Sequence, residues 1–476
     1  MKKIKQLAAA AAALITVTSV TACDESNGVG TSNNPGNAPT ASTASSTTSG
    51  VPSTMKEEDA KTISDIEVQE FNLENKTIKF LSSWPMNPAN GKAVPVSLEM
   101  FQQKYGGEVV DIVCPWDARY DQLGAMVAAG DSPDFFSAAD LDVFPKGAIY
   151  NMFEPLDKYI DFDSELWQPT KEINDLFMFK DNHYVAAVGS DAGVVMIYNK
   201  KTIENYNLAD PQALLEEDNW TWDTCWEMMS KFCNVEDKRY AIDGWWFVNA
   251  FNATTGVPII GMENGVIVNN LNDPKIELAQ EYLLKMHMNE MPYPKWEYGW
   301  QINPSNIAGG KTLFYPCGIW ALYEADLSHF GNMEDIAFVP MPRCPSADKY
   351  YLPTAIDAYS ICKGAQNPEG VACWLYCQMV SRDDERAIEI GKNQLFEDYG
   401  WTEEMYDMLK KTQELTEQNP MIDFYAGVTP NLYDLLNNPT QETFNNGLSW
   451  TQTRESIYSA VQAEVDAANA MIPGAN

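Results

Sequence analysis

Three apolar segments near the beginning of the folded region decide the fold class. They read KTIKFL at residues 76–81, EVVDIVC at 108–114 and PDFFS at 133–137. Two stretches with helical periodicity, 97–105 and 120–129, separate them, and each ends at a glycine. Strands that alternate with helices at this spacing indicate βαβ units and a parallel sheet.

Aromatic and acidic residues follow these strands directly. Trp84 comes after the first strand, Trp116 and Asp117 after the second, and Asp140 after the third. Ligands of parallel sheets bind beyond the carboxyl ends of the strands. We therefore expect these side chains to contact a ligand, although Asp140 could instead cap the N-terminus of a helix.

The first 22 residues read as an export signal. Three lysines precede a short run rich in Ala, Leu, Ile and Val, and Val20-Thr21-Ala22-Cys23 closes the run with small residues. This order is typical of a secretion signal, and the run is shorter than a membrane-spanning helix requires. The tetrapeptide resembles a bacterial lipobox, which implies that Cys23 carries a lipid. The alternative is an ordinary signal peptide in which Cys23 has no role.

The segment after Cys23 is expected to be a tether. Residues 24–54 are Ser, Thr, Asn, Gly, Pro and Ala with almost no bulky apolar side chain, and we place the disordered region at 23–70. Such a chain buries too little surface to offset the entropy of ordering. No later window is apolar and long enough to span a bilayer. The folded part is thus expected outside the cell, attached to the cell membrane by its lipid.

Composition limits the partners. The formal net charge is −35, which argues against nucleic acid and anionic membranes, because both need clustered cations. The length that remains after the tether is enough for two large domains. The chain has 14 Trp, and each one packs in the core or contacts a ligand.

The cysteines leave two alternatives open. An even number in an exported protein suggests disulfides. The surroundings of Cys373 and Cys377 are apolar, which instead indicates free thiols on a buried helix face. A metal site is not expected, because the chain has only three histidines. Besides Cys23, the cysteines are Cys114, Cys225, Cys233, Cys317, Cys344, Cys362, Cys373 and Cys377.

Several short motifs occur in the order seen in one protein family. They are the segment 120–134, FEPLDKYI at 153–160, MIYNK at 196–200, TWD at 221–223, and Gly310-Lys311 with Gly318-Ile319-Trp320. In this order the chain resembles the extracellular solute-binding proteins of ABC importers, specifically the carbohydrate-binding family 1 that includes maltose-binding protein. The resemblance covers nearly all of residues 76–470. Three cysteines (225, 233 and 373) and the aromatic stretch 292–300 depart from the family pattern.

The resemblance implies an α/β protein with two lobes of the periplasmic-binding-protein type (type II), each a mainly parallel sheet flanked by helices. A hinge that the chain crosses near 184–191, 353–359 and 419–425 would join them. The first lobe would combine 72–188 with 355–418, and the second 189–354 with 419–476. The function implied is capture of a carbohydrate, an oligosaccharide, and its delivery to the membrane permease of an ABC transporter by a monomer that needs no cofactor.

The expected contact residues are those that suit a sugar, because aromatic rings pack on its C–H faces and carboxylates or amides bind its hydroxyl groups. Adjacent residues on a strand point to opposite sides, so only one of Trp245 and Trp246 is expected to face the ligand. Trp222 is expected to pack in the core. The full set is Trp84, Trp116, Asp117, Asp140, Tyr184, Trp245, Trp246, Asn249, Trp300, Trp320, Asp357 and Tyr359.

Two other functions fit the composition. A surface glycoside hydrolase would also be acidic and rich in Trp, with paired carboxylates. However, the chain has no G-x-S-x-G, H-E-x-x-H or phosphate-loop motif. A binding protein for peptides or polyamines is the other alternative. The abundance of Trp favours a sugar over peptides and polyamines. The hydrolase is disfavoured because no such catalytic motif is present and the three histidines stand isolated, so we do not expect an enzyme.

Overall fold

The computed structural model describes residues 54–472, apart from 89–90, 245–246, 264, 295–304 and 324–327. The expected signal peptide and Cys23 therefore lie outside the described residues, as do Trp245, Trp246 and Trp300. In the described part of the chain, no helix is long and apolar enough to cross a membrane.

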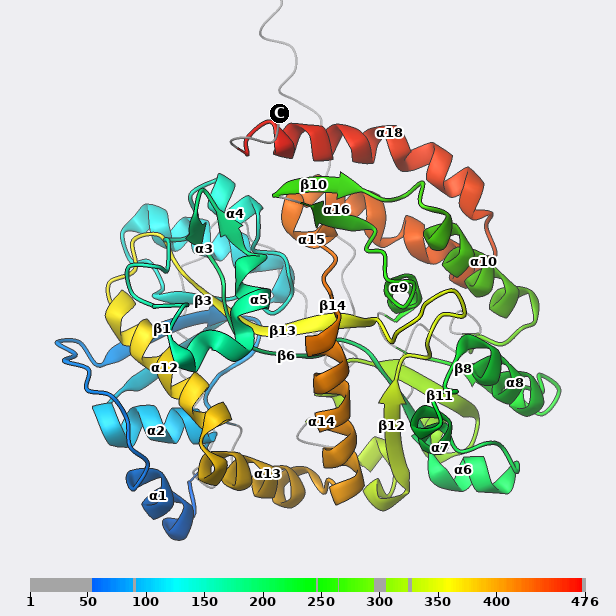
Figure 1. The fold of residues 1–476 in the computed structure, drawn as a ribbon, viewed down its shortest axis with the longest axis horizontal. Helices are drawn as coiled ribbons and strands as arrows, with labels where there is room; N and C mark the ends of the chain where they lie inside the picture. The colour runs from blue at the N-terminus through cyan, green and yellow to red at the C-terminus, as the bar shows by residue number, and fades with distance from the viewer. Residues whose placement is uncertain are drawn as a thin grey trace, which may run out of the picture. The chain divides into compact units, whose positions relative to one another are not determined.

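The first lobe is built on the sheet that the opening segments predict (Figure 1). β1 pairs in parallel with β2 on one side and with β3 on the other, and β13 runs antiparallel to β3. The strand order is β14-β13-β3-β1-β2. The parallel βαβ prediction is thus confirmed. The strands are β1 (Thr77–Ser82), β2 (Glu108–Val113), β3 (Phe135–Ser137), β6 (Ala186–Ala192), β13 (Leu352–Ile361) and β14 (Pro420–Met421).

Helices and short strands surround this sheet, and glycine ends two of the helices as expected. Gly106 and Gly130 follow them in the left-handed conformation, with φ of 66° and 72°. The elements of this lobe are α1 (Glu57–Ser64), α2 (Val96–Tyr105), η1 (Trp116–Ala118), α3 (Arg119–Ala129), α4 (Lys146–Ile149), η2 (Glu165–Thr170), α5 (Lys171–Asp175), β4 (Met178–Phe179), β5 (Asn182–His183), α12 (Pro368–Asp383) and α13 (Glu385–Tyr399).

The tether expected through residue 70 is wrong at its C-terminal end. α1 is a helix, and Ile63 and Ile66 are buried in the core of the first lobe. Lys104 on α2 donates to the carbonyl oxygens of Ser64 and Ile66 at 2.6 and 2.7 Å. The prediction failed because α1 has only one buried apolar residue, so its order comes from packing on α2 rather than from its own sequence.

Three strands form the hinge between the lobes. β6 pairs antiparallel with β13 from Thr354↔Ala192 to Tyr359↔Ala186, and β14 pairs in parallel with the beginning of β13. Each of the three expected crossings overlaps one of these strands.

The second lobe contains a four-stranded sheet in the order β12-β7-β11-β8. β7 runs antiparallel to both β11 and β12, whereas β11 and β8 are parallel. The expectation of a mainly parallel sheet therefore needs correction at β7, which enters from the hinge and runs against its two neighbours. The strands are β7 (Val195–Asn199), β8 (Tyr240–Ile242), β11 (Thr312–Cys317) and β12 (Ile336–Pro340).

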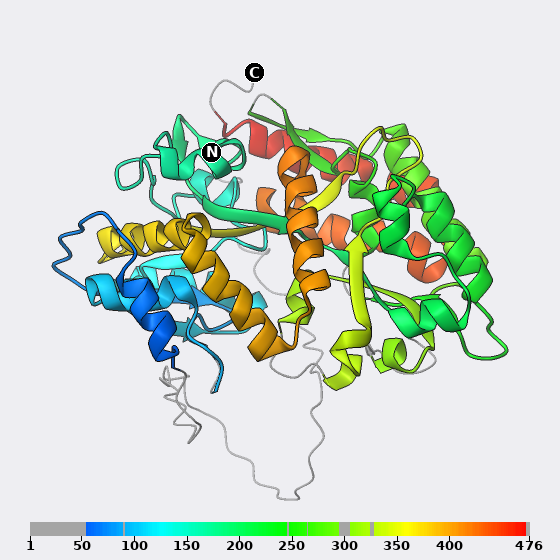
Figure 2. The ribbon, with the colours of Figure 1, turned by 60° about the horizontal axis from the view of Figure 1, so that its bottom comes forward.

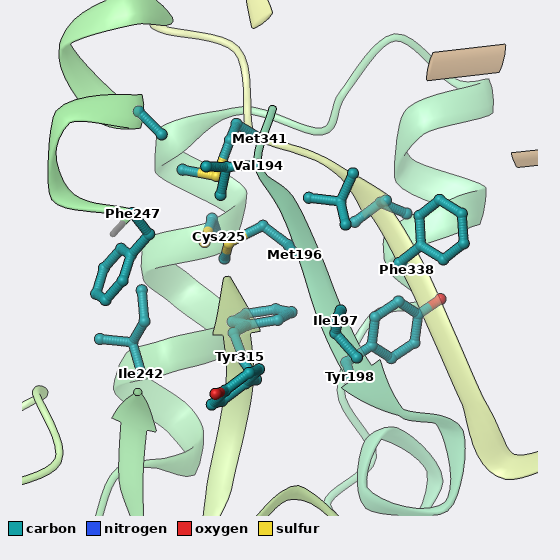
Figure 3. Packing of buried hydrophobic residues seen from close by; sticks show 14 of the residues in the cluster. Val194, Met196, Ile197, Tyr198, Cys225, Ile242, Phe247, Tyr315, Phe338 and Met341 are labelled. Atoms are coloured by element: carbon teal, nitrogen blue, oxygen red, sulfur yellow. The ribbon is translucent and has the colours of Figure 1, made fainter. Parts of the chain in front are cut away.

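Apolar side chains from this sheet and from α8 (Trp222–Phe232) form the largest core cluster (Figure 3). Thr221 caps α8 with a capping box, as expected. Trp222 is buried and stacks on Tyr282 with ring centroids 4.5 Å apart, which confirms its packing role. The other elements here are α6 (Lys200–Asn205), α7 (Pro211–Glu216), α11 (Ser305–Ala308), η3 (Ile319–Leu322), η4 (Ser328–Phe330) and η5 (Met333–Asp335).

One long helix, α14 (Glu403–Gln418), lies against the hinge strands between the two lobes (Figures 1 and 2). Its buried residues Met405, Met408 and Leu409 belong to the core of the second lobe. The expected division placed 355–418 in the first lobe. We assign α14 to the second lobe instead, because its apolar face packs there.

The remaining elements form a C-terminal layer in which β9 and β10 pair antiparallel and α18 lies against β10 (Figure 1). Phe424 contacts Phe144 and Phe177 of the first lobe, with centroids 6.4 and 5.9 Å away, so one core continues across the third crossing. The elements are α9 (Val248–Ala253), β9 (Ile260–Glu263), β10 (Val266–Asn269), α10 (Pro274–Met288), α15 (Tyr425–Val428), α16 (Pro430–Asn437), η6 (Pro439–Gln441), α17 (Glu442–Asn446) and α18 (Trp450–Asn469).

All eight cysteines in the described part of the chain are free thiols. Cys373 and Cys377 are fully buried on α12, as their apolar surroundings predict. Burial raises the pKa of the Cys377 thiol, and the neighbouring Cys373 raises it further. Of the two alternatives, disulfides or free thiols, the described part of the structure therefore has free thiols.

Candidate functional site

The carboxyl ends of β1, β2 and β3 meet at one edge of the first sheet, because the three strands are parallel and in register. Trp84, Trp116 and Asp140 follow these ends, as predicted. Trp84 is 40% exposed and Trp116 is 42% exposed, which is unusual for tryptophan in a folded protein. The edge of this sheet thus presents two large aromatic surfaces to solvent.

Arg119 organises the residues at this edge. Its side chain is 1% exposed and lies over the rings of Trp116 and Phe136, at 5.0 and 5.4 Å from their centroids. Its Nη1 donates to Asp140 Oδ2 at 2.7 Å and its Nη2 to Asp142 Oδ2 at 2.8 Å. Charge-assisted bonds of this kind are the strongest hydrogen bonds in proteins. One buried guanidinium therefore ties the loop after β2 to the loop after β3.

Trp116 is oriented by the same carboxylate. Its indole Nε1 donates to Asp140 Oδ2 at 3.0 Å, and its carbonyl oxygen accepts from Arg119 Nε at 3.0 Å. Asp140 is thus engaged with Trp116 and Arg119, and the next helix begins only at Lys146. The alternative role of Asp140 as a helix N-cap is excluded by these contacts.

Two tyrosines of the C-terminal layer that the sequence analysis missed extend this cluster: Tyr433 lies beside Trp116, and Tyr425 stacks on Tyr433. The ring centroids of Tyr433 and Trp116 lie 5.9 Å apart. Tyr425 and Tyr433 lie 5.9 Å apart with their planes at 10°. Tyr425 also shares a side-chain hydrogen bond with Asn249 on α9. We call Trp116, Arg119, Asp140, Tyr425 and Tyr433 the strand-end cluster.

Close contacts with the first lobe fix the position of α15. A Cβ on Gly427 would lie 1.9 Å from the carbonyl oxygen of Phe144, so only glycine fits. Lys146 Nζ donates to the carbonyl oxygen of Ala426 at 3.3 Å. Asp423 accepts from the backbone N–H groups of Ile259 and Ile260 at 2.7 and 3.1 Å. These contacts place Tyr425 beside Tyr433 without any ligand.

Burial shifts the pKa values of the titratable side chains in and beneath the strand-end cluster. It raises the pKa of Asp142 even though the cations of Arg119 and Lys146 oppose the shift, and it lowers the pKa of Lys146. It also raises the pKa of Tyr433, and the carboxylates of Asp434 and Asp140 add to that effect. Tyr433 is therefore a neutral hydroxyl at physiological pH.

The other expected contact residues lie in different surroundings. Trp320 follows β11 in the second lobe and is 52% exposed, and Asp117 is exposed on η1. Tyr184 and Asp357 are half-buried at the hinge, where Asp357 forms an ion pair with Arg382. Tyr359 is 3% exposed and packs on Phe80, Phe135 and Trp374. Its ring belongs to the core of the first lobe, so we leave it out of the contact set.

The sequence contains only weak signals for Tyr433 and Arg119, which the sequence analysis missed. Tyr433 follows Leu432 on α16, and the buried Leu432 and Leu436 lie one turn apart. An aromatic residue beside such a buried stripe could have been noted as a candidate. Its contact with Trp116, however, depends on packing between segments that are distant in the sequence. Arg119 is the first residue of α3, after the short helix η1 that begins at Trp116, and its burial could not be read from the sequence.

The cluster combines flat aromatic faces with a carboxylate and hydroxyl groups, which suits polar molecules that also have an apolar face. In the described ranges, no group of three or more His, Cys, Asp or Glu side chains could hold a metal ion. The fold and these residues define a two-lobed binding protein with aromatic contacts at the strand ends.

The comparisons with known proteins agree with this class. Residues 97–389 match the family model described as bacterial extracellular solute-binding protein. This match covers more than half of the chain, so the chain belongs to that family. No curated protein sequence matches the chain.

Solved structures with the same fold bind sugars. An ABC substrate-binding protein from Listeria monocytogenes in complex with cycloalternan is 16% identical, with a TM-score of 0.58, over 83% of this chain and 97% of that one. A cyclo/maltodextrin-binding protein complexed with maltotetraose is 12% identical, with a TM-score of 0.58, over 83% and 99%. The sugar-binding protein MalE from Xanthomonas citri is 16% identical, with a TM-score of 0.56, over 82% and 98%. At these identities the likeness shows the fold.

Proposed function

We propose that this protein captures a carbohydrate, an oligosaccharide, between its two lobes and delivers it to the permease of an ABC transporter. The observation that carries the proposal is the arrangement of Trp116 and Asp140 opposite Tyr433. The ring of Trp116 offers a face on which a sugar ring can pack, and Asp140 offers a carboxylate beside it that can accept from hydroxyl groups. The sugars named for the solved structures of the same fold support this choice of ligand.

The proposed contact residues come from both sides of the hinge. Trp84, Trp116, Asp117 and Asp140 belong to the first lobe, and Asn249, Trp320, Tyr425 and Tyr433 to the second lobe and the C-terminal layer. Trp245, Trp246 and Trp300 remain predictions on residues outside the described ranges. Tyr184 and Asp357 are proposed to act at the hinge.

The protein is proposed to be a monomeric lipoprotein on the outer face of the cell membrane. The lipobox-like sequence at 20–23 supports this location. Replacing Cys23 with Ala should release the protein into a detergent-free supernatant. A Cys23→Ala variant that stays with the membrane would show another anchor.

A thermal-shift screen of the purified full-length chain against oligosaccharides tests the proposal. A ligand that binds the native state alone raises the melting temperature by mass action. The best oligosaccharide should do so and should remain uncleaved after prolonged incubation. Accumulation of reducing ends in proportion to protein would identify a glycoside hydrolase. A shift with peptides or polyamines but with no sugar would identify a binder of another solute.

A further inference from the structure

The cations at the strand-end cluster are buried, whereas its outer carboxylates are exposed. Among the residues that the structure describes, two cations act on this cluster, Arg119 and Lys146, and both are buried. Arg119 is held by Asp140 and Asp142, and Lys146 lies 4.3 Å from the ring centroid of Tyr120 while it donates to Ala426. Arg119 cannot reach a ligand without leaving the buried carboxylate of Asp142 unpaired, and Lys146 would have to give up its buried contacts with Ala426 and Tyr120.

The acidic side chains lie on the outside of the same cluster. The side chain of Asp140 is 40% exposed, and Asp117 and Asp434 are exposed. Arg119 and Trp116 both bind Oδ2 of Asp140. Within the described part of the chain, its Oδ1 has no hydrogen-bond partner. A ligand therefore meets an oxygen that only accepts hydrogen bonds, next to an open aromatic face.

We propose that the strand-end cluster selects uncharged, hydroxyl-rich saccharides and rejects acidic ones such as uronates, and that Arg119 is the positioning residue for this selection. The proposal rests on the proposed function. A sugar hydroxyl donates to Asp140 Oδ1, whereas a carboxylate has no proton to donate there and is repelled. Two like charges about 5 Å apart at a partly buried site correspond to a loss of affinity on the order of 100-fold.

Arg119 makes this discrimination possible in two ways. It holds Asp140 in one orientation through the Nη1 bond to Oδ2, and its guanidinium lies over the ring of Trp116. Lysine cannot replace it, because a single ammonium group cannot bridge Asp140 and Asp142 and also bond to the Trp116 carbonyl. The selection thus depends on the planar guanidinium as well as on its charge.

The test measures affinity by calorimetry for paired neutral and acidic probes. The probes are gluco-, galacto- and manno-oligosaccharides of three to four units and the oligoglucuronates, oligogalacturonates and oligomannuronates of the same length. The wild-type chain should bind a neutral probe at least ~30-fold more tightly than its acidic counterpart. An acidic probe that binds as tightly as the neutral one would overturn the selection but not the proposed function. Failure of every probe in both series would overturn both.

Variants separate charge from structure. Asp140→Asn keeps the acceptor oxygen and the size of the side chain, so it should reduce the preference for the neutral probe to about threefold or less. Arg119→Lys should lower the affinity for the neutral probe about tenfold or more. It should also reduce the ratio of the affinities for the neutral and the acidic probe. Asp163→Asn is the matched control, because Asp163 is an exposed carboxylate paired with Lys171. An unchanged preference in Asp140→Asn would show that Asp140 is merely structural and would contradict the proposal.

Discussion

The ring of Trp116, which follows β2 in the first lobe, lies 5.9 Å from the ring of Tyr433 on α16 in the C-terminal layer. The two residues come from opposite sides of the third crossing. Both rings nevertheless belong to one packed body, because the core of the first lobe continues into α15 and α16. A ligand that packs on these rings favours one arrangement of the lobes only if it also contacts the second lobe, where Trp320 is exposed.

Ligand binding should therefore make the molecule more compact. The expected change is a smaller radius of gyration at saturating oligosaccharide, because a ligand on the strand-end cluster also reaches Trp320 of the second lobe only in the closed arrangement. Small-angle scattering with and without the ligand measures it. An unchanged radius at saturation would indicate a preformed, rigid site.

Replacing Gly427 with Ala should destabilise the protein by about 2 kcal/mol or more. The added Cβ would lie 1.9 Å from the Phe144 carbonyl oxygen and 2.7 Å from that of Leu141, so α15 would have to move. Thermal unfolding without ligand measures the change. Gly124→Ala on α3 is the control, because nothing lies within 4 Å of its added Cβ and alanine favours helices. Equal melting temperatures for Gly427→Ala and the wild type would show that α15 is not fixed to the first lobe.

Much of the fold could be predicted because its signals are local. The strands at 76–81, 108–114 and 133–137 are short apolar runs bounded by glycine, proline or acidic residues, and the structure has a strand in each. Trp116 and Asp140 could be placed together from topology alone, because parallel strands end at the same edge of a sheet.

The rest depends on contacts distant in sequence. α1 is ordered because it packs on α2, and α14 belongs to the second lobe because its apolar face packs there. Tyr433 lies beside Trp116 only because the chain returns to the first lobe after the third crossing. Tyr359 was misread because β13 is buried on both sides from Ala358 to Ile361, and this burial depends on helices such as α12 that pack on the sheet from distant parts of the sequence.

Asp191 should make stability depend on pH. Burial raises its pKa to about 6, although Ala192 N–H, Thr412 and Gln413 hydrogen-bond to it. The native state therefore binds a proton between pH 4 and pH 6 that the unfolded chain, with a pKa of about 4, has released. The raised pKa of Asp191 therefore increases the free energy of unfolding below about pH 4, and this stabilisation is lost as the pH rises through about 6.

The variant Asp191→Asn lacks this titration. Its melting temperature relative to the wild type should therefore be higher at pH 7.5 than at pH 4.5. Asp384→Asn should show no such trend over this range, because Arg386 lowers the pKa of Asp384 and this carboxylate is then ionised in both the native and the unfolded state. Parallel curves for Asp191→Asn and the wild type across this range would rule out the buried ionisation of Asp191.

The thiols provide a test of the core. Since the eight described cysteines are free, eight thiols should react with a thiol reagent in denaturant without reductant, in addition to any unacylated Cys23. In the native state, Cys225, Cys362 and Cys373 should react slowly, because they are fully buried. A lower count in denaturant that rises after reduction would reveal disulfides.

The most direct test of carbohydrate capture at the strand-end cluster is a calorimetric titration of the best oligosaccharide against the wild type, Trp116→Ala and Tyr433→Ala. Each truncation removes aromatic contact area worth about 1–3 kcal/mol, which predicts a five- to hundredfold loss of affinity with a near-normal melting temperature. Trp226→Ala is the control, because Trp226 lies in the middle of α8 with Lys285 Nζ 3.6 Å from its ring centroid, so this variant should bind normally. Unchanged affinity in both Trp116→Ala and Tyr433→Ala would contradict the account.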